Sequence, residues 1–153
     1  MNVAQPSEAL DRAVRMHVFG VVAKTARVPT NSETAAALGL PQAEVEESLR
    51  RLAAGKVLVL APNTVNVWMA NPFSAVPSAF KVRSRGLTYF APCIWDALGI
   101  PAALDADAEI ETTCGDCGSA IGIAVRARRL SREEGVVHFA LPALRWWDNI
   151  GFT

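Results

Sequence analysis

The chain has 153 residues, of which 51% are hydrophobic and 20% are charged. These proportions exclude an intrinsically disordered class and suit either one hydrophobic core or two small ones. Fifteen basic and fifteen acidic residues give a formal net charge of zero. The overall charge therefore does not favour nucleic acid or an anionic membrane as a partner.

The sequence predicts a cytoplasmic protein without a membrane partner. No apolar run is long enough to span a bilayer, and the stretch Met1–Ser7 lacks the basic and apolar regions of a signal peptide. The three cysteines are an odd number, which fits a reducing compartment where thiols serve as ligands or nucleophiles.

The first 70 residues predict three helices followed by a hairpin. Apolar residues recur at helical spacing after a plausible N-cap at Ser7, and Gly39 and Gly55 are suited to end the second and third helices. Two β-rich runs flank a turn at Pro62–Asn63. This order is that of a winged-helix unit. The expected helices cover residues 7–24, 32–38 and 41–55, and the expected strands cover residues 57–60 and 65–69.

The third helix of this unit argues against nucleic acid as a partner. Its exposed positions include Glu44, Glu46 and Glu47, which phosphate groups would repel. The hairpin offers no basic residue beyond Lys56 near its start. We therefore disfavour DNA binding and keep a winged-helix regulatory protein only as an alternative function.

A proline-rich connector at residues 71–78 divides the chain into domains at 1–70 and 79–153. Beyond it, the pattern predicts a hairpin around Ser84–Gly86 and further strands. The predicted fold is thus α+β, with a winged-helix-like domain followed by a small mixed β-sheet domain with short helices. The strands expected in the second domain cover residues 80–82, 87–90, 108–113, 119–125 and 136–141.

A thiol and a carboxylate lie three residues apart behind Pro92, a good first residue of a helix. Cys93 would lie in the first turn, where backbone amides and the helix dipole favour its thiolate form. Asp96 would lie on the same face of the helix, which Gly99 and Pro101 should end. The alternative interpretation is an inert buried thiol beside a capping aspartate.

The stretch Cys114–Gly118 reads Cys-Gly-Asp-Cys-Gly between two predicted strands. Such a turn is typical of a zinc knuckle, but a structural zinc site needs four ligands and only one pair is present, so we disfavour zinc. A redox dithiol would lack its usual βαβ surroundings, and cysteines that merely pack are a further possibility. Cys114 or Cys117 could also lie near Cys93 and supply a second soft ligand.

Several segments, taken in order, resemble the alkylmercury lyase (organomercurial lyase) family, and together they extend over most of the chain. The resemblance implies that Cys93 is the first thiolate on mercury and that Asp96 holds the metal or relays the proton. In that family a second catalytic cysteine follows the segment matching 152–153, a position that this sequence lacks. A truncated relative and a different chemistry both stay open. The matching segments are Met69–Pro77, Cys93–Leu104, Cys114–Gly118, Val137–Pro142 and Trp146–Thr153.

The function implied by the resemblance is protonolytic cleavage of carbon–mercury bonds by Cys93 and Asp96. The substrate would be a small organomercurial, no cofactor would be required, and the bound product Hg(II) would leave to cytosolic thiols. The candidate metal ligands are Cys93, Asp96, Cys114 and Cys117. The alternative is a non-catalytic binder or sensor of soft metal or organometal ions, so enzymatic activity and oligomeric state stay open.

Overall fold

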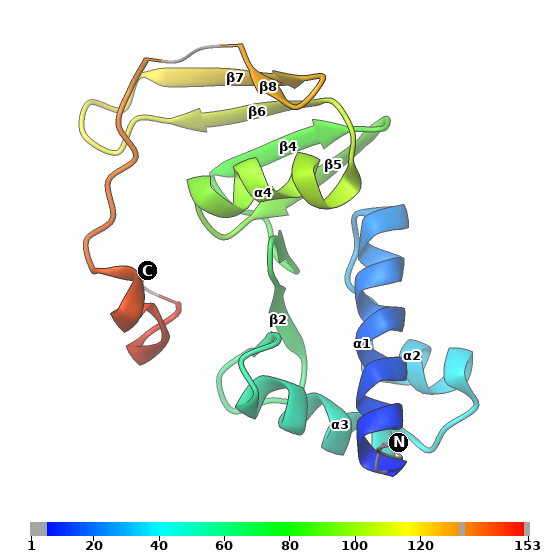
Figure 1. Cartoon of the computed structure of the whole chain (residues 1–153). Helices are drawn as coiled ribbons and strands as arrows, with labels where there is room; N and C mark the ends of the chain where they lie inside the picture. Colours follow the sequence, from blue (N-terminus) through cyan, green and yellow to red (C-terminus); the bar gives the residue numbers. More distant parts are fainter. Residues whose placement is uncertain (1–5, 132–133, 152–153) are drawn as a thin grey trace, which may run out of the picture.

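The computed structural model describes residues 6–131 and 134–151 (Figure 1). Helices dominate the N-terminal part and antiparallel sheets follow, which confirms the predicted α+β class. The start of the chain, which we compared with a signal peptide, and the last two residues of the family-like segment lie outside the described residues. No described helix is both long and apolar enough to cross a membrane.

Three helices form the N-terminal part, close to the predicted positions. α2 begins with a capping box, in which the Thr30 hydroxyl accepts the Glu33 amide and the Glu33 carboxylate accepts the Thr30 amide. It ends at Gly39 in the left-handed conformation. The bounds are α1 (Pro6–Thr25), α2 (Asn31–Leu38) and α3 (Gln42–Ala54).

A three-stranded sheet follows in the order β1-β2-β3, formed by β1 (Val59–Leu60), β2 (Val67–Ala70) and β3 (Phe73–Ser74). The predicted hairpin is present, with Asn63 at φ 58° in its turn. β3 was not predicted, because it lies in the proline-rich connector. One hydrophobic cluster joins this sheet to the helices, with Val14, Val18, Val45, Leu49 and Leu58 among its buried members.

The second sheet has the order β5-β4-β6-β7-β8. We expected a mixed sheet, but each described pairing is antiparallel, because hairpins rather than helical crossovers join most neighbouring strands. Arg85 and Gly86 both have positive φ, as a tight hairpin turn between β4 and β5 requires. The strands are β4 (Phe80–Ser84), β5 (Leu87–Ala91), β6 (Ala108–Thr113), β7 (Ala120–Arg126) and β8 (Arg129–Leu130).

α4 (Ile94–Leu104) packs against this sheet and is longer than predicted. Gly99 and Pro101 lie inside the helix rather than at its end. Ile100 and Leu104 are buried in the core beneath it, so tertiary packing outweighs the helix-breaking tendency of the two residues. A Cβ at Gly99 would lie 3.3 Å from Pro72, so the glycine lets the helix approach the connector closely.

α1 contributes to both hydrophobic clusters. Val14 and Val18 belong to the first cluster, whereas Val22 is buried in the second one with the residues of the large sheet and α4. The Tyr89 hydroxyl on β5 donates a 2.8 Å hydrogen bond to the carbonyl of Ala23 near the end of α1. The helical part and the large sheet are therefore joined by packing as well as by the connector.

The C-terminal segment corrects another prediction. Residues 136–141 do not form the expected strand, and Val136 is 93% exposed. The segment instead descends along one side of the molecule to a 3-10 turn at Ala143–Asp148 (Figure 1). There the Lys56 ammonium lies 5.6 Å from the centre of the Trp147 ring. The largely apolar run over residues 136–141 suggested a strand, but these residues pair with no described strand.

Candidate functional site

β5 and α4 together position the predicted thiol and carboxylate. Cys93 is the N-cap of α4, with extended backbone angles of φ −148° and ψ 178°, rather than a residue of the first helical turn. Its carbonyl accepts the Ala97 amide at 2.9 Å. Its thiol donates a hydrogen bond to Oδ2 of Asp96 over 3.2 Å. The predicted juxtaposition of these two side chains is therefore present, held between a strand and a helix.

The environment of the pair favours the neutral thiol, contrary to our expectation of a thiolate. Burial, which has the largest effect, and the negative charge of Asp96 together raise the pKa of Cys93 to about 11. The backbone amides of Trp95 and Asp96 act in the opposite direction but are outweighed. Burial also raises the pKa of Asp96, although the hydrogen bond from Cys93 lowers it. Both side chains therefore keep their protons to a higher pH than an ordinary cysteine and aspartate do.

This environment predicts the pH dependence of Cys93 alkylation. Because the thiolate is the reactive form, the alkylation rate should rise with pH until about pH 11. Replacing Asp96 with asparagine removes a negative charge beside the sulfur, so the pKa of Cys93 should fall and the midpoint of the profile should move to lower pH. Iodoacetamide labelling followed by mass spectrometry of the Cys93 peptide measures this. An unchanged midpoint would contradict the proposed interaction.

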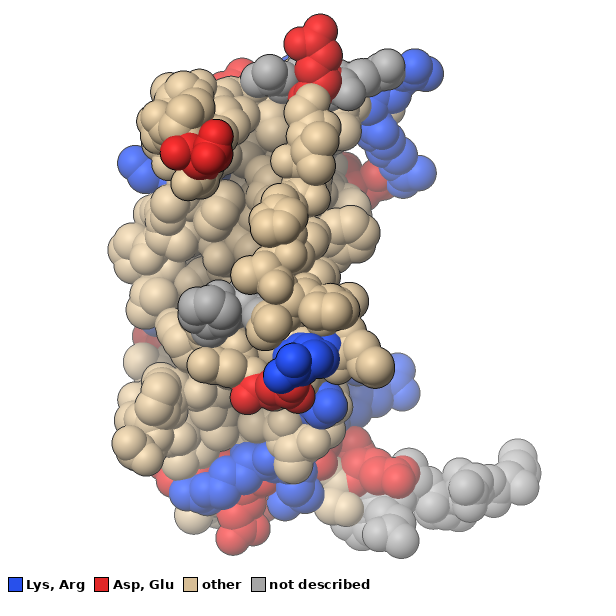
Figure 2. Space-filling model, turned by 90° about the vertical axis from the view of Figure 1, so that its left-hand side faces the viewer, with Lys and Arg blue, Asp and Glu red and all other residues tan. Residues whose placement is uncertain are grey.

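An apolar groove of about 1040 Å³ opens beside the start of α4. Ile94, which directly follows Cys93, lines it together with Cys114, although Cys93 itself does not. The β6–β7 turn lies on the left-hand side of Figure 1, and uncharged side chains cover most of the middle of that face in Figure 2. The groove therefore suits a small apolar organic group. Its other apolar lining residues are Phe80, Leu98, Ala120, Ile121, Ile123, Leu130, Val136 and Val137.

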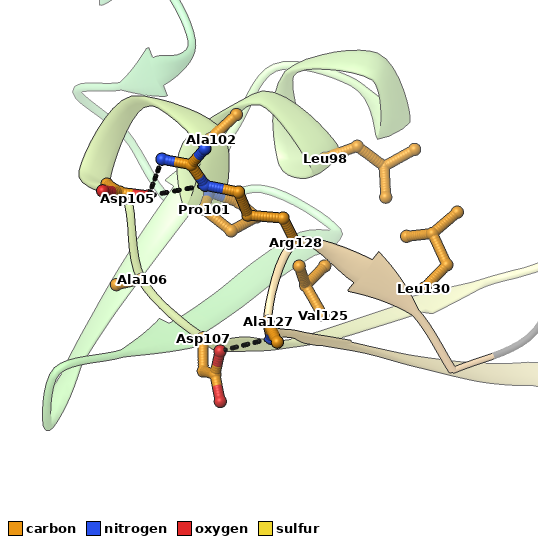
Figure 3. Close-up of a pocket in the computed structure, with 10 residues that line it drawn as sticks. All are labelled: Leu98, Pro101, Ala102, Asp105, Ala106, Asp107, Val125, Ala127, Arg128 and Leu130. Carbon is orange, nitrogen blue, oxygen red and sulfur yellow. Dashed lines mark hydrogen bonds and ion pairs between the residues drawn. The ribbon is translucent and has the colours of Figure 1, made fainter.

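A second pocket, of about 750 Å³, lies toward the other end of α4 (Figure 3). Its charged groups are occupied by each other and by the backbone. Arg128 donates to Asp105 at 2.9 and 2.6 Å, and Asp107 accepts the Ala127 amide at 2.9 Å. No thiol is among its lining residues, so the pocket offers no ligand for a soft metal.

The four predicted metal ligands form two pairs. Cys93 and Asp96 make one, and Cys114 and Cys117 lie together in the turn between β6 and β7. Among the residues that the structure describes, no group of three or more His, Cys, Asp or Glu side chains could hold a metal ion. The sequence interpretation also missed Ser119, whose hydroxyl lies 3.1 Å from the Cys117 sulfur; its place two residues after the second cysteine was the available signal.

The fold and the site define an α+β protein with a partly buried thiol–carboxylate pair next to an apolar groove. The family model described as alkylmercury lyase matches residues 73–153, a range that contains both pairs. The chain therefore belongs to the alkylmercury lyase family, which confirms the resemblance drawn from the sequence.

A solved structure is similar in fold. It is described as the crystal structure of the mercury-bound form of MerB2, with a TM-score of 0.61 and 20% sequence identity. The similarity covers 80% of this chain and 66% of the MerB2 chain, so this chain spans just under two thirds of the length of that chain. No curated protein matches the chain.

Proposed function

We propose that the protein cleaves carbon–mercury bonds of small organomercurials by protonolysis, with Cys93 as the mercury-binding thiol and Asp96 as the proton carrier. The observation that carries this proposal is the 3.2 Å hydrogen bond from the Cys93 thiol to the Asp96 carboxylate. Membership of the alkylmercury lyase family supports it.

In the first step, Cys93 displaces a thiolate from an organomercury thiolate complex. A bond forms between the Cys93 sulfur and mercury, the original mercury–thiolate bond breaks, and the thiol proton moves to Asp96. The existing hydrogen bond already points from the sulfur to the oxygen that takes the proton. Burial, which raises the pKa of Asp96, favours the protonated carboxyl that results.

In the second step, Asp96 gives this proton to the carbon bound to mercury. The electron pair of the carbon–mercury bond becomes the new carbon–hydrogen bond, the hydrocarbon leaves, and Asp96 is a carboxylate again. Before this proton transfer, the thiolate of a small-molecule thiol also binds the mercury and weakens its bond to carbon, since mercury is a soft ion that prefers sulfur. Hg(II) then leaves as a complex with small thiols of the cytoplasm, where we place the protein.

The groove beside Ile94 would hold the organic group during both steps. Its lining is largely apolar, so it would exclude water from the carbon that accepts the proton. Asp96, rather than bulk water, would then be the acid that delivers the proton.

The test follows two products from the same incubation. Reduced protein is mixed with a phenylmercury salt and excess monothiol, and released benzene and protein-bound mercury are measured together. We expect several molecules of benzene per protein molecule. Bound mercury without benzene would contradict the lyase proposal and support the second candidate, a non-catalytic binder or sensor. We keep this second candidate because no third potential metal ligand lies near the pair among the described residues.

The regulatory alternative receives no support from α3. Its two arginines are engaged within the protein, because Arg51 pairs with Asp11 at 2.7 Å and Arg50 lies 3.9 Å from Glu46. These pairs leave few cations to neutralise phosphates along this helix. We therefore do not propose nucleic acid as a partner.

A further inference from the structure

We propose that the turn between β6 and β7 is a second soft-metal site, in which the sulfur atoms of Cys114 and Cys117 together bind one Hg(II) ion. This inference rests on the proposed function, because Hg(II) is the product of that reaction. It assigns to the turn the role of first acceptor for the released metal.

The backbone holds the two cysteines in one closed turn. The Cys114 amide donates to the Ser119 carbonyl at 2.8 Å, and the Gly118 amide donates to the Cys114 carbonyl at 2.9 Å. Gly118 has a φ of +71°, which a glycine adopts without strain. The strand ladder reaches the turn through the pair Thr113 and Ala120. The cysteines are thus held by a hydrogen-bonded hairpin. Metal binding should therefore cost little conformational entropy.

The two cysteines of the turn are at least partly accessible to solvent. The Cys117 sulfur lies 3.1 Å from the Ser119 hydroxyl. Cys117 is exposed and Cys114 is partly buried, and both are free thiols. The turn therefore offers a solvent-facing sulfur and a more protected one, which is the arrangement that a transferable metal ion requires.

The number of ligands selects the ion. Structural zinc needs four ligands, and among the described residues no third His, Cys, Asp or Glu side chain completes a metal-binding group here. Hg(II) is satisfied by two thiolates in a linear arrangement, and soft thiolates favour soft ions. Binding releases one proton from each thiol and forms two sulfur–mercury bonds, so no oxidant or reductant is needed.

The groove connects this turn with the candidate active site. Cys114 and Ser119 are among its lining residues, and so is Ile94, which directly follows Cys93 in the chain. Mercury released at Cys93 therefore has a route to Cys114 along the surface of the same molecule. Hg(II) could pass from the Cys93 thiolate to the Cys114 thiolate by ligand exchange, so that it stays bound to sulfur throughout.

The experiment uses mercuric chloride, excess monothiol and the full-length protein, so it requires no organomercurial. Bound mercury is counted after gel filtration, and thiolate-to-mercury absorption is recorded in the ultraviolet. Cys93→Ser should still bind one Hg(II) per chain in a species of unchanged size. Adding Cys117→Ser or Cys114→Ser to Cys93→Ser should weaken this binding at least about a hundredfold, because one of two ligands is lost.

Three results would overturn the inference. The first is that Cys93→Ser binds no Hg(II), and the second is that the double variants bind it as tightly as Cys93→Ser does. The third is a complex with one mercury per two chains, which would show that exposed Cys117 bridges neighbouring molecules. Because the exposed position of Cys117 makes its replacement compatible with folding, circular dichroism should be unchanged. Benzene release by the wild type tests the proposed function separately, so the two failures can be distinguished.

Discussion

Replacing Cys93 with serine should abolish organomercurial binding at the candidate site and lower benzene release by more than about a thousandfold, as is typical when a nucleophile is removed. A serine oxygen is a hard ligand and does not replace sulfur on a soft metal. The hydroxyl can still donate to Asp96 as the thiol does, so α4 should keep its start. The loss would then be chemical rather than structural.

The measurement needs a variant in which the other two cysteines cannot bind phenylmercury. Cys114 and Cys117 are free and would bind phenylmercury themselves, so both are first replaced with serine. In that background the protein that keeps Cys93 should retain one phenylmercury per chain against excess monothiol, and the protein that also carries Cys93→Ser should retain none. Stoichiometric binding that survives the loss of Cys93 would rule out both the lyase and the thiol-binder interpretations of the site.

Replacing Asp96 with asparagine should separate binding from cleavage. Cys93 would still take up phenylmercury, and its sulfur would even ionise more readily without the neighbouring negative charge. The proton carrier would be lost, however, and benzene release should fall by about a hundredfold or more, within the range for removing a general acid. Single-turnover benzene release from pre-bound phenylmercury measures the second step alone.

Asp105→Asn is a matched control for this substitution. Asp105 follows the other end of the same helix and pairs with the exposed Arg128, away from the thiol. Because exposed ion pairs contribute little to stability, this variant should fold and release benzene at the wild-type rate. If Asp96→Asn also released benzene at that rate, Asp96 would not be the proton carrier.

The elements that the sequence predicted well are those determined by local signals. The helices of the N-terminal part, both hairpins around their turn residues and the strand over residues 108–113 are close to their predicted bounds. The pairing of Cys93 with Asp96 was also predictable, because residues three apart at the start of a helix share a face.

The errors come from contacts between distant residues. α4 continues past Gly99 and Pro101 because Ile100 and Leu104 are buried against the sheet, and no local rule contains that contact. The protonated state of Cys93 follows from its burial, which outweighs the amides of the helix start. The strand expected at 136–141 is absent, because a run of β-forming residues shows only that the segment could pair, not that a neighbouring strand is available.

The position of α1 has a consequence for how this chain unfolds. The family match begins at residue 73, yet Val22 fills part of the core beneath α4 and Ala23 accepts the hydroxyl of Tyr89. A fragment starting at residue 73 would lack both and would leave a buried polar group and a void. Heat or denaturant should therefore melt helices and sheet in one cooperative transition, and the thiol–carboxylate pair depends on the N-terminal helix for its integrity.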